Sequence, residues 1–133
     1  MDEAVKSVIR AVTEASDQER IAFPAVVQAL AAAGVERYHA DLVRASKTYY
    51  LPDGASHEVP AQPLAVPPAP AFSATGVETA VRHVQAGAIG YGAFCAEIAA
   101  AGCVGYFVTL AGRRAIYYGR TGDSHTEWFP GAV

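Results

Sequence analysis

Two histidines in the chain are each followed, two positions later, by a carboxylate. His39 and Asp41 form the first pair, and His125 and Glu127 form the second. Because side chains two residues apart lie on the same face of a β-strand, either pair could relay a proton or bind a metal ion. These four residues are therefore the candidate catalytic residues of a small enzyme acting on polar substrates.

Another histidine, His57, is followed directly by Glu58. Together with the two pairs, these residues could form a cluster of imidazole and carboxylate ligands of the kind that a divalent metal accepts. The sequence contains no His-x-x-x-His pattern and no closely spaced cysteine pair. A solvated strand face has the same residue composition, so we predict neither a metal site nor a cofactor.

Tyrosines and basic residues gather in two short segments, at 44–50 and 113–120. A small anionic molecule bound there would find aromatic stacking and a bidentate guanidinium donor together. The candidate ligand-binding residues are Tyr50, Tyr118, Arg120, Arg114 and Lys47.

Common catalytic signatures are missing from the sequence. There is no Gly-x-Ser-x-Gly elbow, no Walker phosphate loop and no Gly-x-Gly-x-x-Gly turn. We therefore expect a non-catalytic binding or regulatory module. The histidine and carboxylate enzyme described above is the alternative.

The composition restricts the partners of the chain. Its 133 residues carry a net charge of −3, which provides no positive field to attract nucleic acid. The apolar stretches are too short to cross a bilayer, and the N-terminus lacks the features of a signal peptide. We expect a cytoplasmic protein that binds neither nucleic acid nor membranes. The two cysteines, Cys95 and Cys103, are expected to act as small core residues.

An internal repeat organises the whole sequence. Shifting the chain by 68 residues aligns Gly34 with Gly102 and Tyr38 with Tyr106, and it aligns the Tyr-Tyr pair at 49–50 with the pair at 117–118. Two copies of this length are too few for a solenoid. We therefore predict one domain with pseudo-two-fold symmetry, which arose by duplication.

Each copy changes from a helical to an extended pattern. Apolar residues recur with a helical period at 5–12 and 77–84, and a second helix is expected to start at Phe23 with Pro24 in its first turn. Gly34 and Gly102 are expected to end the second helices with positive φ. After these glycines the apolar residues recur with a period of two. This pattern predicts a β-hairpin in each copy and an additional edge strand near 125–129.

A proline-rich segment at 52–71 separates the copies and cannot form a helix or an interior strand. Repeat 1 is placed at about 4–58 and repeat 2 at about 73–130, with Ser73 or Thr75 as the N-cap of its first helix. We predict a single α+β domain spanning 1–133, in which helices cover one face of a shared antiparallel sheet.

Several motifs that span nearly the whole chain belong together, and they are Gly34 to Arg44, Lys47 to Tyr50, Ala101 to Cys103, Ile116 to Arg120, Gly122-Asp123, His125 and Phe129-Pro130. They resemble the motifs of the YbcV-like family, a group of uncharacterised small bacterial proteins often labelled phage envelope protein. The label of the family implies a phage or virion-associated protein, which is a third alternative for the function.

Alternation along the strands places His39, Asp41, Val43, Phe107 and Tyr118 on the sheet face opposite the helices. An exposed phenylalanine with apolar neighbours forms a patch that soluble monomers seldom leave open. We therefore expect this face to be covered by the proline-rich segment, by a ligand, or by the second subunit of a homodimer.

Overall fold

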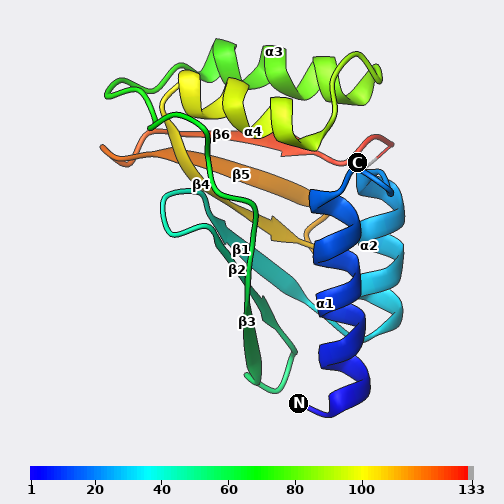
Figure 1. Cartoon of the computed structure of the whole chain (residues 1–133). Coiled ribbons are helices and arrows are strands. Elements are labelled where there is room, and N and C mark those ends of the chain that lie inside the picture. Colours follow the sequence, from blue (N-terminus) through cyan, green and yellow to red (C-terminus); the bar gives the residue numbers. More distant parts are fainter. Residues whose placement is uncertain (132–133) are drawn as a thin grey trace.

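The computed structural model describes residues 1–131, and within that range the chain forms four helices and six strands (Figure 1). The same order of two helices and three strands occurs twice, which agrees with the predicted α+β class. Common ancestry of the two halves stays a prediction. The elements in chain order are α1 (Glu3–Asp17), α2 (Phe23–Ala32), β1 (Arg37–Asp41), β2 (Ser46–Tyr50), β3 (Ser56–Pro60), α3 (Ala74–Gln85), α4 (Tyr91–Ala100), β4 (Cys103–Thr109), β5 (Arg114–Gly119) and β6 (Ser124–Trp128).

All six strands belong to one antiparallel sheet with the order β3-β2-β1-β4-β5-β6. The halves meet at the centre, where Tyr38 of β1 lies opposite Val108 of β4 and Ala40 lies opposite Tyr106. The two edges are β3 and β6. Because both halves contribute to one sheet, they share one hydrophobic core.

The two faces of the sheet differ in their cover. We call the face toward the helices the helix face, and it carries buried side chains that alternate along each strand, including Tyr38, Tyr49, Tyr106 and Tyr117. The opposite face, called the open face, carries His39, Tyr50, Phe107, Ile116 and Tyr118. Helix α1 packs against α2, and α3 packs against α4.

The helix ends follow the sequence signals. The Ser73 hydroxyl accepts a hydrogen bond from the Gly76 amide (3.0 Å), so Ser73, and not the alternative Thr75, is the N-cap of α3. Gly34 and Gly102 have φ values of +90° and +86°, which confirms that each closes a helix in the left-handed conformation. No helix in the described part of the chain is long and apolar enough to cross a membrane.

The proline-rich segment contains a strand before it crosses to the second half. Strand β3 lies at the edge of the sheet, where the missing amide of Pro60 is tolerated. The segment then passes the end of α4, where the amides of Ala69 and Ser73 donate to the carbonyls of Ala99 and Ala101. Leu64 and Phe72 pack against the core at this position, on the helix side of the sheet.

The open face is therefore not covered within one chain. Phe107 is 47% exposed, so the proline-rich segment does not cover it, contrary to one of the expected arrangements, and Trp128 on the same face is 54% exposed. The physical reason is the core contact of Leu64 and Phe72, which keeps the crossover on the helix side.

Candidate functional site: a cavity between the helix pairs and the sheet

A cavity of about 610 Å³ lies between the two helix pairs and the helix face. Small-molecule sites typically enclose roughly 300–1,000 Å³, so this cavity has the size of a ligand site. Both halves of the chain line it, and the lining is mostly aromatic and aliphatic. The aromatic residues on the helix face and on the helices that cover it are Phe23, Tyr38, Tyr49, Tyr91, Phe94, Tyr106 and Tyr117.

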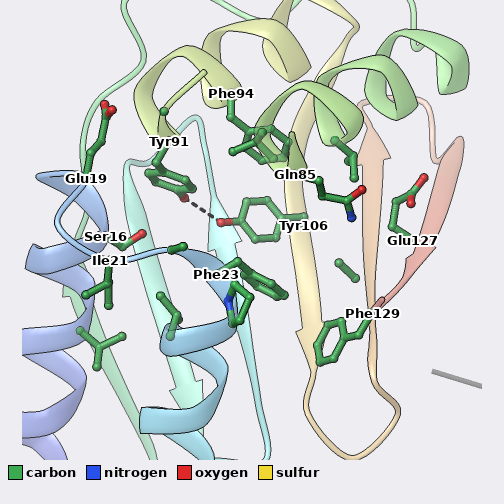
Figure 2. A pocket seen from close by; sticks show the side chains of 18 of the residues that line it. Ser16, Glu19, Ile21, Phe23, Gln85, Tyr91, Phe94, Tyr106, Glu127 and Phe129 are labelled. Carbon is green, nitrogen blue, oxygen red and sulfur yellow. Dashed lines mark hydrogen bonds between the residues drawn. The ribbon is translucent and has the colours of Figure 1, made fainter. Parts of the chain in front are cut away.

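Pairs of hydroxyl groups provide polar groups in this apolar lining. The hydroxyls of Tyr91 and Tyr106 lie 2.7 Å apart, and Figure 2 shows these side chains pointing toward one another from α4 and β4. Thr13 and Tyr49 form a second pair at 2.7 Å. Burial raises the pKa of Tyr91 and Tyr106 well above 10.0, so both phenols stay neutral at physiological pH.

Lys47 places a basic group in the cavity lining. It lies between Ala40 and Val59 in the sheet register, so its side chain points to the helix face, where it is only 4% exposed. Its ammonium nitrogen lies 4.4 Å from the centre of the Tyr91 ring. Within the residues described, no carboxylate oxygen comes within 4.0 Å of this nitrogen.

The pKa of Lys47 reflects this burial. Desolvation lowers the pKa of the amine below its usual 10.5, and the negative charges of Asp17 and Cys95 oppose that shift only in part. The pKa of Asp17 is itself raised by burial, although the charge of Lys47 opposes the rise. An amine in an apolar cavity without an ion-pair partner is a group with which a ligand can interact favourably.

One side of the cavity is closed by contacts between the loops of the two halves. Glu19, in the loop between α1 and α2, has a positive φ of 58° and accepts a long hydrogen bond (3.4 Å) from the Gly92 amide. Its carboxylate lies against Gly90, where a Cβ atom would overlap it. The carboxylate therefore sits at the N-terminus of α4, where the helix dipole favours negative charge.

The structure separates the candidate ligand-binding residues. Lys47 lines the cavity, whereas Tyr50, Tyr118 and Arg114 lie on the open face, and Arg120 is exposed in the turn after β5. The strand register explains the separation, because Lys47 alternates with Thr48 and shares its face with Tyr49. On the open face the guanidinium of Arg114 stacks on Trp128, and that of Arg37 stacks on Tyr50.

The four candidate catalytic residues are also split between the two faces. His39 lies on the open face, where its Nε2 atom is 2.7 Å from the Tyr118 hydroxyl. Asp41 accepts hydrogen bonds from the amides of Val43 and Arg44 and holds the turn after β1. Burial lowers the pKa of His39, although Asp41 partly opposes the shift. His39 and Asp41 thus lie across the sheet from the second pair.

His125 and Glu127 lie together on the helix face of β6, with His125 Nε2 at 2.6 Å from Glu127 Oε2. Glu78 of α3 brings a third potential metal ligand, and the three ligand atoms lie within 4.8 Å of one another. Arg82 already supplies positive charge at this point, because its guanidinium is 2.9 Å from Glu127. The arrangement is therefore an ion-pair network that joins α3 to β6.

The remaining candidates occupy structural positions. His57 faces the helices opposite Tyr49, and its Nε2 atom is buried without a hydrogen-bond partner among the described residues. Both cysteines are free thiols, and Cys103 is fully buried in β4. Burial raises the pKa of Cys103 to about 11, so this thiol is a core residue, as the sequence indicated.

Sequence reasoning missed most of the cavity. Of the residues that line the cavity, the sequence analysis selected Lys47 and Glu127 as candidate site residues and none of the tyrosines of the helix face. A usable signal for Lys47 was present, because Lys47 and Tyr49 are two residues apart in a strand and therefore lie on the same face of the sheet. The position of Tyr91 above Lys47 had no such signal, because it depends on how α4 crosses the sheet.

The family model described as "Protein of unknown function (DUF1398)" matches residues 58–126, just over half of the chain. The chain belongs to the DUF1398 family. No curated protein matches it. The match covers the part of the DUF1398 protein that contributes Tyr91 and Tyr106 to the cavity, and Lys47 lies before it. The description of the family names no activity, and the narrower YbcV-like resemblance stays a prediction.

Proposed function

We propose that this DUF1398 protein is a non-catalytic binding module that holds a small, mostly apolar molecule with one negatively charged group in the central cavity. The observation that carries the proposal is the buried Lys47 amine in a cavity of about 610 Å³ that is otherwise lined mainly by aromatic and aliphatic groups. This location refines the expected anionic ligand, because Lys47 is the candidate ligand-binding residue that lines the cavity.

Electrostatics supports an anionic group on the ligand. Removing an ammonium group from water without a counter-ion costs several kcal/mol, and the Tyr91 ring offsets only part of that cost. A carboxylate about 4 Å from the ammonium would contribute a gross attraction of about 4 kcal/mol at an effective dielectric constant of about 20. The ligand would thus supply the missing charge partner.

The rest of the lining supports a flat or aromatic body for the ligand. Ring faces and edges favour offset or perpendicular contacts with another aromatic ring. The hydroxyls of Tyr91 and Tyr106 add hydrogen-bonding groups at a defined place. An aromatic carboxylic acid combines these features, with its ring among the tyrosines and its carboxylate toward Lys47.

The test compares phenylacetate with phenylacetamide, which has a similar shape and no charge. Isothermal titration calorimetry should give the acid an affinity at least about tenfold higher than that of the amide. Lys47→Met should remove this preference. Arg114→Met removes the same charge from the open face and should leave the preference intact. Equal binding of acid and amide by the wild type would contradict the proposal, as would an unchanged preference in Lys47→Met.

We also propose that a second copy of the chain covers the open face. The support is the exposure of Phe107, next to the partly buried rings of His39 and Tyr118, and of Trp128 on the edge strand β6 of the same face. Large apolar side chains that gather on one surface are typical of interfaces. Native mass spectrometry should then give twice the 13.9 kDa chain mass, and a monomer would contradict the proposal.

A further inference from the structure

We propose that Lys47 also forms a reversible imine with a small aldehyde or ketone that enters the central cavity. This inference uses the cavity of the proposed function and adds a covalent reaction to it. Non-covalent binding of an acid depends on the charged form of Lys47, whereas imine formation depends on its neutral form. The two uses of the same nitrogen can therefore be tested separately.

The geometry around Lys47 suits a nucleophilic amine. Its strand is hydrogen-bonded on both sides, to β1 and to β3, so the base of the side chain is held rigidly. The amine lies against the Tyr91 ring and has no carboxylate within 4.0 Å among the residues that the structure describes. Nothing in this environment neutralises the amine by direct ion pairing, and the cavity leaves room for a carbonyl compound next to it.

The burial of Lys47 favours the neutral amine, although the charged groups that face it oppose this effect in part. Asp17 approaches from α1, and Cys95 and Tyr91 approach from α4. Desolvation outweighs the charges of Asp17 and Cys95, so the pKa of Lys47 lies below 10.5. Lysines with a lowered pKa in apolar surroundings are the ones that form Schiff bases with carbonyl compounds.

The reaction balances without an oxidant or reductant. The neutral nitrogen attacks the carbonyl carbon and forms a C–N bond as the C=O π bond breaks, and one proton passes from the nitrogen to the oxygen to give a carbinolamine. The hydroxyl then takes up a proton and leaves as water, and the nitrogen releases its second proton to give the imine. The products are one imine and one water molecule. The low solvent access around Lys47, which is 4% exposed, slows the reverse hydrolysis.

The lining identifies the carbonyl compound by class. Tyrosine and phenylalanine rings surround the cavity, which favours an aromatic or branched apolar aldehyde or ketone over a sugar or another polar carbonyl compound. The hydroxyl pair of Tyr91 and Tyr106 lies in the same cavity and can donate to the carbonyl oxygen. Benzaldehyde is a suitable probe because it is small, apolar and aromatic.

The chain provides its own control, because it has only two lysines, Lys47 and Lys6. The intact protein is incubated with benzaldehyde and sodium cyanoborohydride near neutral pH, and the trapped benzyl adducts are located by peptide mass spectrometry. We expect Lys47 to be labelled at least about tenfold faster than Lys6, because a larger share of its amine is in the neutral, nucleophilic form. Labelling of Lys6 at the same rate or faster would overturn the proposal.

Two variants separate the imine from non-covalent binding. Lys47→Arg keeps the positive charge and cannot form an imine, so it should keep the preference for phenylacetate over phenylacetamide and lose benzaldehyde trapping. Lys47→Met should lose both. If the wild type prefers phenylacetate but Lys47 is not trapped, the imine is refuted and the proposed function stands. If Lys47 is trapped without that preference, the proposed function fails and the imine stands.

Discussion

The two halves of the molecule use the same order of elements but differ in the cavity that they enclose. Lys47 of β2 and Ala115 of β5 occupy corresponding positions, and both line the cavity. Only the first half places an amine there. A second difference follows at the first residues of α2 and α4, where Phe23 corresponds to Tyr91, and Tyr91 contacts the Lys47 ammonium. The two halves therefore have similar backbones, but only the first half contributes an amine to the cavity that they enclose.

The largest expected effect is a loss of stability at the glycines that end α2 and α4, and it should differ between the two. A methyl group on Gly102 would overlap the carbonyl of Ala71, whereas a methyl group on Gly34 would meet no atom within 4 Å. Gly34→Ala should cost about 1–2 kcal/mol for the left-handed backbone alone. Gly102→Ala should cost about 3 kcal/mol or more, because the backbone at Ala71 must also move. Urea unfolding measures both costs, and equal losses would contradict the close crossover contact.

The next effect tests the cost of burying the Lys47 amine. Lys47→Met should raise the free energy of unfolding at neutral pH by about 1–3 kcal/mol, because it removes a desolvated charge and keeps the volume of the side chain. The converse change, Ala115→Lys, should destabilise the protein by a similar amount or more. A loss of stability in Lys47→Met would show that the amine has a stabilising partner.

The same variant has a defined pH dependence. The folded-state pKa of Lys47 is lowered, so the cost of its charge is fully present below that pKa and disappears as the pH rises to 10.5. Between the folded-state pKa and 10.5, the unfolded chain binds more protons than the folded chain. The stability of the wild type therefore increases as the pH rises through this range. The advantage of Lys47→Met should shrink over the same range in urea unfolding at several pH values. A constant advantage would rule out the charge as its cause.

A smaller effect distinguishes two corresponding tyrosines. The Tyr49 hydroxyl bonds to Thr13, whereas the Tyr117 hydroxyl has no side-chain partner within the described range. Tyr49→Phe should cost about 1 kcal/mol, and Tyr117→Phe should be close to neutral. Thermal unfolding of the two variants tests this order. Equal effects would show that the Thr13 contact adds nothing measurable.

The smallest effect on folding concerns Phe107 and the corresponding His39, which are cross-strand neighbours on the open face with ring centres 4.5 Å apart. Because Phe107 is 47% exposed, Phe107→Asp should change the free energy of unfolding of one chain by less than about 1 kcal/mol. The same change should convert a homodimer into a monomer in native mass spectrometry. An unchanged dimer mass would place the interface elsewhere.

Much of the local structure was predictable because its causes are local. The period of apolar residues, Ser73 and the two glycines located the helices and their ends, and alternation placed His39 and Phe107 on the face away from the helices. These features depend on backbone geometry within a few residues, which the sequence specifies directly. The α+β class and the helix, helix, β-hairpin order of each half follow from them, whereas strand β3 was not predicted.

The site depended on distances that no local pattern specifies. The sequence analysis grouped His39 with His125, and Lys47 with Tyr118, on the basis of residue type. The sequence does not show how distant strands pair. Strand pairing placed the members of each group on opposite faces. The cavity exists because the two helix pairs pack on separate parts of one sheet face, and their separation is set by side-chain volumes from both halves. Tertiary packing therefore decided that Lys47, a strand residue near a turn, became a buried amine beneath Tyr91.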